Sequence, residues 1–368
     1  MTKAAELAKM GEVLTNSQIG GRRNIIINGA MQVAQRGTSS TSTSYATVDR
    51  IMVRTNNLDQ LAFTQSQSST VPSGEGFSNS FKFEVTTQET ALSGGEYANI
   101  QHRIEAQNLQ SLAYGTSNAK KATLSFWVRS SLTGKYSVLF FAEDDTRSNT
   151  QSFTISSADT WEHKTITIDG DTTGVIDNNS GSGININFQL AAGSDYAGTP
   201  HSGWGAYAET DDFAFDDQVN FIAQTGTFYL TGLQFEIGEQ ATPFEHRSFG
   251  EELALCQRYF YRWKTDGEAY SNLCIGGCTS TTKARGVAQF PQTMRSNASL
   301  SSSGTFRIVS MGSGNVGTSI TVSINRGHTL QPYIQFERSG GSSLTAGQTA
   351  EMGANNDTDA VIDFSAEL

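Results

Sequence analysis

The sequence predicts an all-β protein, and three observations lead to this prediction. Of the 368 residues, 36 are Gly and only 17% are charged, while Ser, Thr, Asn and Gln are abundant, a balance typical of many strands and turns. Short runs of alternating apolar and polar residues recur along the chain, separated by turn residues. No long helical pattern lies between these runs, which favours a sandwich or jelly roll over alternating strands and helices.

A short helix is predicted at the start of the sequence. Residues 2–14 are rich in Ala, Leu, Lys and Glu, and Leu7, Met10 and Leu14 follow at spacings of three and four. Because so short a helix is marginal alone, we expect either an oligomerisation seam, most simply of a homotrimer, or a helix laid on the protein's own surface. Residues 1–23 form this attachment segment and its linker.

The predicted jelly-roll domain covers residues 24–247. It opens with a β-branched run over 24–33, which contains the turn signal Asn28-Gly29. It closes in GTFYLTGLQFEIGEQATPFEHR, where the alternation shifts phase at Gly232, as a bulge would cause, and Pro243 ends the strand. The other expected strands are 49–54, 61–66, 80–85, 98–104, 122–129, 136–142, 151–155, 161–168 and 184–190.

A connector helix and a second β-domain are predicted after the closing strand. Ser248 and Glu251 fit a capping box, and Leu253, Cys256 and Phe260 continue a helical spacing, so residues 248–263 form the expected connector. The strand pattern then resumes, which predicts a smaller β-sandwich knob over 264–368. Its expected strands are 269–275, 284–290, 305–310, 320–324, 333–337 and 360–364.

Charge and hydropathy exclude several classes of partner. The formal net charge is -11 and no basic cluster is present, so phosphate-backbone binding would lack its main driving force, and we expect no nucleic-acid partner. The start MTKAAELAKMGEV has no continuous apolar core, and no segment approaches about 20 apolar residues. We therefore expect neither an export signal nor membrane insertion.

The three cysteines do not form a disulfide framework, since their number is odd and all lie late in the chain. We expect Cys256, Cys274 and Cys278 to be reduced, partly buried thiols. A metal site on Cys274 and Cys278 would need two more ligands, of which only His328 is at hand.

A long irregular segment, 191–220, offers the candidate binding residues. Its Tyr196, Trp204 and Tyr207 could form a stacking platform for sugar rings. Alternatively, these aromatics pin the segment to the sandwich or contact a neighbouring subunit. Trp127 and Trp161 lie within alternating strands and are expected to be core or interface residues.

Acidic pairs in the same region are weak calcium candidates. They could supply the oxygen ligands that calcium requires, although solvated surface carboxylates explain them as well. These residues are Asp211, Asp212, Asp216 and Asp217, with Glu143, Asp144 and Asp145 elsewhere in the domain. No other cofactor is expected. The sequence also lacks recognisable catalytic motifs, and its five histidines are isolated, so we expect no enzyme.

Several segments carry a family resemblance. NIIING, LSFWVR and FYLTGLQFE resemble, in this order, the scaffold of jelly-roll carbohydrate-binding modules. INGAMQVAQRGTS, TVDRIMV, VPSGEGFSNS, IEAQNLQSLAYGTSNAK, LTGLQFEIGEQATPFEHRSFGEELALCQRYF and FSAEL resemble virion proteins of tailed bacteriophages, especially marine and cyanobacterial phages. The likeness covers about residues 20–263. Thr231-Gly232 stands where the carbohydrate-binding family often has an Asp pair, which puts a calcium ion tied to that position in doubt.

The resemblance implies a virion surface protein, made in the bacterial host cytoplasm. We expect a homotrimeric tail fibre or receptor-binding protein that adheres to host surface polysaccharide and joins other virion proteins through its N-terminal segment. A capsid-decorating or head-fibre protein is the first alternative. A polysaccharide-degrading fibre enzyme and a carbohydrate-binding module of a secreted cellular enzyme are the others.

Overall fold

The computed structural model describes residues 23–312 and 314–368, in which the chain divides into two compact units between Glu252 and Leu253. The all-β class is confirmed, because strands dominate both units. The predicted helix with Leu7, Met10 and Leu14 lies outside the described residues. In the part of the chain that is described, no helix is both long and apolar enough to cross a membrane.

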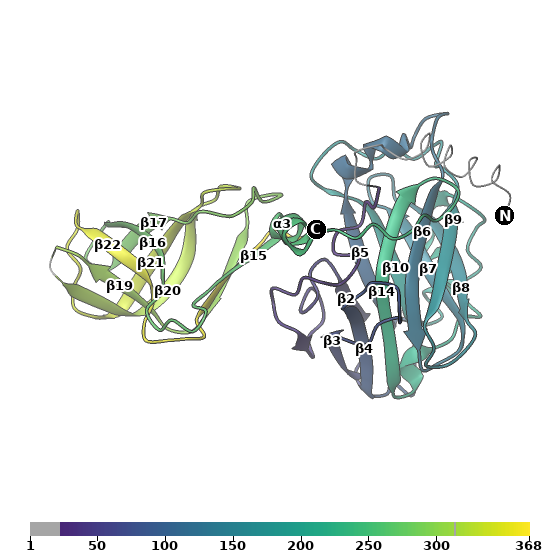
Figure 1. The fold of residues 1–368 in the computed structure, drawn as a ribbon, viewed down its shortest axis with the longest axis horizontal. Coiled ribbons are helices and arrows are strands. Elements are labelled where there is room, and N and C mark those ends of the chain that lie inside the picture. The colour runs from purple at the N-terminus through teal and green to yellow at the C-terminus, as the bar shows by residue number, and fades with distance from the viewer. Residues whose placement is uncertain (1–22, 313) are drawn as a thin grey trace. The chain divides into compact units, whose positions relative to one another are not determined.

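The first unit is a sandwich of two six-stranded antiparallel sheets (Figure 1). Sheet A has the order β1 (Ser39–Ser40), β3 (Ala62–Ser68), β4 (Ser80–Thr87), β14 (Gly226–Ile237), β6 (Ala122–Ser130) and β9 (Glu162–Ile168). Sheet B has the order β12 (Gly205–Ala206), β8 (Arg147–Ile155), β7 (Gly134–Ala142), β10 (Ser182–Ala192), β5 (Tyr97–Glu105) and β2 (Met52–Asn56).

Short elements connect these strands. The 3-10 helix η1 (Ala106–Leu112) follows β5, in the region where the sequence suggests one helical turn. The segment between β10 and β14 contains β11 (Ala197–Gly198), helix α2 (Glu209–Asp212), β13 (Ala214–Phe215) and η2 (Phe221–Ala223). Strands β11 and β13 pair with each other in parallel, and β12 joins the edge of sheet B. We call residues 193–220 the insertion.

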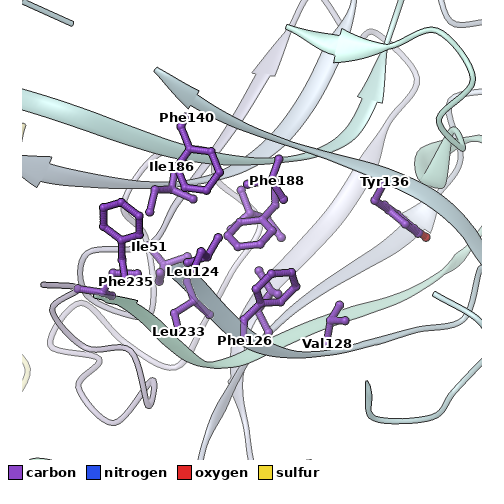
Figure 2. Packing of buried hydrophobic residues seen from close by; sticks show 14 of the residues in the cluster. Ile51, Leu124, Phe126, Val128, Tyr136, Phe140, Ile186, Phe188, Leu233 and Phe235 are labelled. Carbon is purple, nitrogen blue, oxygen red and sulfur yellow. The ribbon is translucent and has the colours of Figure 1, made fainter. Parts of the chain in front are cut away.

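The core of the first unit lies between the two sheets (Figure 2). Alternate residues of each strand point inward, as the sequence periodicity predicts. Phe126 of sheet A lies edge-on to Phe188 of sheet B with ring centroids 5.0 Å apart. Phe140 and Phe235 also meet across the sheets, at 5.8 Å. These four side chains are at most 1% exposed, so aromatic rings from both sheets fill the core of the sandwich.

The bulge predicted at Gly232 is confirmed. The register of β14 against β6 shifts between Thr231 and Gln234, and Gly232 has φ +62°. A Cβ at this position would lie 2.7 Å from Phe77 Cζ and 3.1 Å from Trp127 Cδ1. Glycine is required here both for its left-handed backbone and for the two rings that lie against it.

The strand predicted over residues 24–33 is wrong, since no ladder forms there. The Asn24 side-chain oxygen accepts hydrogen bonds from the amides of Ile26 and Phe235, at 3.0 and 3.1 Å. Arg247 donates to the carbonyls of Asn24 and Ile26. Side chains therefore satisfy backbone groups that a strand would pair, which is the competition that makes Asn unfavourable in strands.

The connector helix is shorter than predicted. Helix α3 spans Phe249–Gln257, and its capping box is formed, with Ser248 Oγ and the Glu251 carboxylate each accepting from the other's backbone amide. The amide of Tyr259 then bonds to the carbonyl of Cys256 in a turn, and Phe260 already belongs to a strand. The helical spacing of Phe260 is therefore coincidental.

The second unit contains a closed barrel instead of the predicted sandwich. The barrel order is β16 (Asn272–Cys278), β17 (Lys283–Val287), β21 (Tyr333–Gly341), β20 (Asn315–Arg326), β19 (Phe306–Ser310) and β22 (Thr349–Ala354). A separate three-stranded sheet has the order β15 (Phe260–Lys264), β23 (Val361–Ser365) and β18 (Ser299–Ser303).

A pair of glycines allows two strands of this barrel to approach closely. Gly276 of β16 lies opposite Gly286 of β17, and a Cβ at Gly276 would meet the carbonyl oxygen of Arg285 at 1.9 Å. Strand alternation alone predicts neither this close approach nor closure, because both sandwich and barrel strands alternate inward and outward residues.

Candidate functional site

The outward face of sheet B carries a set of polar side chains that we call the polar ladder. It consists of Gln101, Arg103, Glu143, Asn185 and Asn187. Gln101 lies opposite Asn187, and Arg103 opposite Asn185, in the β5–β10 register. Their strand neighbours Ile100, Ile104, Ile184 and Ile186 fill the core on the other face. The alternation that builds the core therefore also lines up the ladder.

Hydrogen bonds fix the orientation of the ladder side chains. Arg103 Nε donates to Gln101 Oε1 at 2.8 Å, and Gln101 Nε2 donates to Asn187 Oδ1 at 2.5 Å. Asn185 Nδ2 donates to Glu143 Oε1 at 2.6 Å. Among the described residues, the Nε–H is the only Arg103 donor with a partner, so most of its guanidinium donors remain for a ligand.

Two aromatic rings border the ladder. Phe141 lies opposite Asn185 in the β7–β10 register, and the Tyr207 ring packs edge-on against Phe141 at 5.0 Å. The amide of Tyr207 donates to the carbonyl of Thr146 at 3.0 Å, which holds this part of the insertion on β8. Burial, followed by the charges of Glu209 and Asp212, raises the pKa of the Tyr207 hydroxyl, which therefore stays protonated.

The three aromatics singled out in the sequence pack in two separate clusters. Tyr196 and Tyr207 belong to one, in which they pack with Phe213 of the insertion and with Tyr97 and Leu139 of sheet B. The Tyr196 ring is 4.8 Å from Tyr97. Trp204 packs against the main core instead.

The Trp204 indole is held by two contacts. It lies edge-on to Tyr114 at 5.6 Å, and its Nε1 donates to the carbonyl of Asp169 at 2.8 Å. Trp204 therefore fastens the insertion to the body of the sandwich, while Tyr207 is the aromatic beside the polar ladder.

The insertion covers two amide side chains whose hydrogen bonding is incomplete. Asn99 and Gln189 face each other across the β5–β10 pair and are 0% exposed. Neither amide atom of Asn99 is bonded, and Gln189 is bonded only through Nε2, which donates to the carbonyl of Phe213. Each unbonded buried group costs about 1–3 kcal/mol, so closure of the insertion depends on its other attachments.

Asp212 is one of these attachments. Its carboxylate is 2% exposed and accepts from the amide of Ala208 at 2.8 Å. The same carboxylate lies 2.6 Å from Nδ1 of His201. Asp212 is therefore committed to holding the insertion together.

The remaining calcium candidates are dispersed. Asp217 pairs with Lys135 at 2.6 Å, and Asp211 and Asp216 are exposed. Asp144 and Asp145 accept from backbone amides of the loop at 175–177. Throughout 23–312 and 314–368, no three His, Cys, Asp or Glu side chains converge as they would around a metal ion.

Trp127 and Trp161 lie outside the core, on the outward face of sheet A. Trp127 neighbours His163 at 5.2 Å, and Trp161 neighbours Tyr229 at 6.0 Å. Both indoles are half-buried. The core alternative is therefore wrong for both, since Trp127 alternates with the inward Phe126 and Val128 and Trp161 directly precedes β9. That they are interface residues stays a prediction.

The prediction of buried, reduced cysteines is confirmed for all three. Burial raises the pKa of the Cys274 thiol to about 12, which makes it an inert core group.

The polar ladder was not predicted from the sequence. Its signal is the run ININFQL, in which Asn185, Asn187 and Gln189 occupy every position between core residues. Strongly polar amides on the outward face of a central strand differ from the Thr and Ser usual there. That difference is the feature that could have indicated a binding face.

Comparisons with known proteins yield likenesses of fold. No protein-family model and no curated protein matches the sequence. One similar structure is the enzymatically active domain of tailspike protein 4 from bacteriophage CBA120, at 12% identity and TM-score 0.32, where the match covers 58% of this chain and 21% of the tailspike chain. A family 4 carbohydrate-binding module matches at 12% identity and TM-score 0.31, over 58% of this chain and 99% of the module.

A third similar structure is the module TmCBM61, solved in complex with β-1,4-galactotriose. It matches at 9% identity and TM-score 0.27, over 60% of this chain and 100% of the module. With TM-scores below 0.5, none of these likenesses carries a statement about the function of this chain.

Proposed function

We propose that this chain is a non-enzymatic surface protein of a bacteriophage particle, and that the polar ladder with its aromatic border binds host glycans. The observation that carries the proposal is the ladder itself. It combines buried amides that hold its polar side chains in fixed orientation, a half-buried guanidinium with free donors and the rings of Phe141 and Tyr207 at one side.

This combination suits a sugar ring. A pyranose presents hydroxyls at its rim, which both donate and accept, and an apolar C–H face that packs on aromatic rings. Arg103 offers paired donors to neighbouring hydroxyl oxygens, and the buried amides of Gln101 and Asn187 hold it in place. Glu143 is the one carboxylate in the ladder and accepts from Asn185, whereas glycoside hydrolysis uses two carboxyl groups. Binding without cleavage is the function that this set of residues favours.

The phage placement is supported by the sequence resemblance over about residues 20–263. The protein would be a tail fibre or receptor-binding protein. As a homotrimer on the virion, it would present three copies of the polar ladder to one cell surface. Linked sites gain by effective concentration what each lacks in affinity. Adhesion to host surface polysaccharide would then result from several weak contacts made together.

A binding screen tests the proposal. The full chain is titrated with five soluble polysaccharides: mixed-linkage β-glucan, β-1,4-galactan, xylan, dextran and a bacterial O-polysaccharide. We expect binding to at least one, unchanged chain length after incubation, and loss of binding in Asn187→Ala. Thr165→Ala, an exposed residue of sheet A, is the matched control and should bind normally.

Two results would contradict the proposal. Shortened polysaccharide chains would make the protein an enzyme. Binding that survives in Asn187→Ala and also in Arg103→Ala would place the site elsewhere on the chain.

A further inference from the structure

The ring of His201 lies between two hydrogen-bond acceptors. Its Nδ1 is 2.6 Å from Oδ1 of Asp212, and its Nε2 is 3.0 Å from the carbonyl oxygen of Ser148. A neutral imidazole carries a proton on only one nitrogen, so it can satisfy only one of these acceptors. The imidazolium carries both protons and satisfies both.

The two acceptors belong to different parts of the first unit. Asp212 is on α2 within the insertion, and Ser148 is on β8 of sheet B. The protonated ring therefore joins the insertion to the sheet. The ring also packs directly on the backbone of Gly205, where a Cβ would lie 2.5 Å from His201 Nε2.

The contacts of His201 help to fix the position of Tyr207. Oδ2 of Asp212 accepts from the amide of Ala208, the residue after Tyr207. On the other side of Tyr207, Gly205 and Ala206 pair with β8 through Ser148 and Arg147. His201 is thus linked to residues directly before and directly after Tyr207 in the chain, the residue whose ring borders the polar ladder.

Charged groups lie on both elements that the His201 ring joins. Helix α2 carries Glu209 and Asp211, both exposed, in addition to the buried Asp212. On β8, the adjacent charge is Arg147, which already pairs with Asp171 at 2.6 Å. The residues of β12 have no titratable side chain.

We propose that His201 is a pH-dependent positioning residue, which as an imidazolium clamps the insertion to β8 and holds Tyr207 beside the polar ladder. Glycan affinity then falls as the pH rises. The link to affinity rests on the proposed function, whereas the clamp does not. Histidine is a common pH-responsive side chain in proteins, so binding to a host surface would respond to acidity.

Hydrogen–deuterium exchange tests the clamp without any ligand. Exchange of the backbone amides in residues 195–217 is measured at about pH 5.5 and about pH 8 and corrected for the intrinsic rates. In the native protein, protection should fall at the higher pH. In His201→Gln, which retains one donor, protection should be the same at both pH values and equal to the native value at high pH.

Affinity is the second measurement, made with the tightest-binding of the five polysaccharides named above. Native affinity should be about tenfold weaker at high pH, as loss of one charge-assisted hydrogen bond produces. His201→Gln should show the weaker affinity at both pH values. Gly205→Ala, whose added methyl group would displace the His201 ring, should also show the weaker affinity at both pH values. This variant replaces His201→Gln in the test if His201→Gln does not fold.

Another histidine provides the control. His163 is exposed on sheet A, and His163→Gln should keep the native pH dependence. His102 needs no control variant, because burial and the Arg50 charge lower its pKa to about 3. Equal protection at both pH values in the native protein, or a pH dependence that persists in both His201→Gln and Gly205→Ala, would overturn the proposal. A working clamp with no polysaccharide bound would instead refute the proposed function alone.

Discussion

Gln101 donates a hydrogen bond to Asn187 at 2.5 Å across two central strands of sheet B, on the face turned away from the core. Both side chains are at most 2% exposed, so this pair is ordered like a core contact although it lies on an outer face. The Oε1 atom of the same Gln101 amide accepts from Arg103 Nε at 2.8 Å. The buried pair therefore fixes the Arg103 side chain, and a preorganised side chain loses little entropy when it binds hydroxyl groups.

Arg103→Ala should weaken glycan binding without unfolding the protein. The substitution removes the guanidinium donors that have no partner among the described residues. Hydrogen bonds from a charged donor contribute about 1.5–3 kcal/mol, so affinity by calorimetry should fall about tenfold to a hundredfold. Arg129→Ala, on the outward face of sheet A, is the control and should leave affinity unchanged. Equal effects of the two variants would argue against the ladder.

Phe126→Ala should strongly destabilise the sandwich. The Phe126 ring is 0% exposed and contacts Phe153 and Phe188, with ring centroids at 5.1 and 5.0 Å. Removing a buried ring leaves a cavity and costs about 3–5 kcal/mol. Urea unfolding measures this loss. Phe249→Ala, at a side chain that is 57% exposed, should change stability by less than about 0.5 kcal/mol.

Gly232→Ala should destabilise the protein by about 1–3 kcal/mol, because a non-glycine residue is strained at φ +62° and its Cβ would lie 2.7 Å from Phe77. Thermal unfolding followed by circular dichroism is the measurement. Gly250→Ala is the matched variant, since a Cβ there meets nothing within 4 Å and the residue is helical. That variant should raise stability by up to about 1 kcal/mol. A neutral Gly232→Ala would disprove the role given to the bulge.

The Arg147–Asp171 pair should stabilise the protein only above acidic pH. Burial alone would raise the pKa of Asp171, but hydrogen bonds from Arg147 and from backbone amides outweigh it, and the pKa lies below its ordinary value. A depressed carboxyl pKa contributes stability above the unfolded-state pKa of about 3.9 and loses it as the pH falls. Asp171→Asn should therefore lower the unfolding free energy at about pH 7, with a smaller difference at about pH 3. A difference that does not shrink in acid would contradict this account.

The sequence predicts the parts of the fold that depend on local pattern. Alternation gives the strands of the sandwich to within a few residues, and the phase shift at Gly232 gives the bulge. Prediction from local pattern fails in two cases. At Asn24, a side chain forms the hydrogen bonds that a neighbouring strand would otherwise form with the backbone. In the second unit, pairing between residues far apart in the sequence decides the architecture. Barrel closure depends on the approach of Gly276 to Gly286, which no local pattern specifies.

Only part of the candidate site could likewise be predicted from the sequence. Tyr207 could be predicted as a candidate from the sequence, because aromatic residues in a long irregular segment are typical of a ligand-binding loop. Its place beside the ladder could not, because the contact with Phe141 depends on how the insertion folds back over β8. Likewise, Gln101 and Asn187 are 86 positions apart, and only the strand register brings them together. Alternation shows which residues share a face, but not which strands are neighbours.

The most direct test of the central claim is an exchange footprint of bound glycan. Hydrogen–deuterium exchange of the full chain is compared with and without the tightest-binding polysaccharide of the screen. The account predicts new protection in β5, β10 and the segment around Tyr207, and none in sheet A or the barrel. Protection confined to sheet A or to the second unit would contradict it.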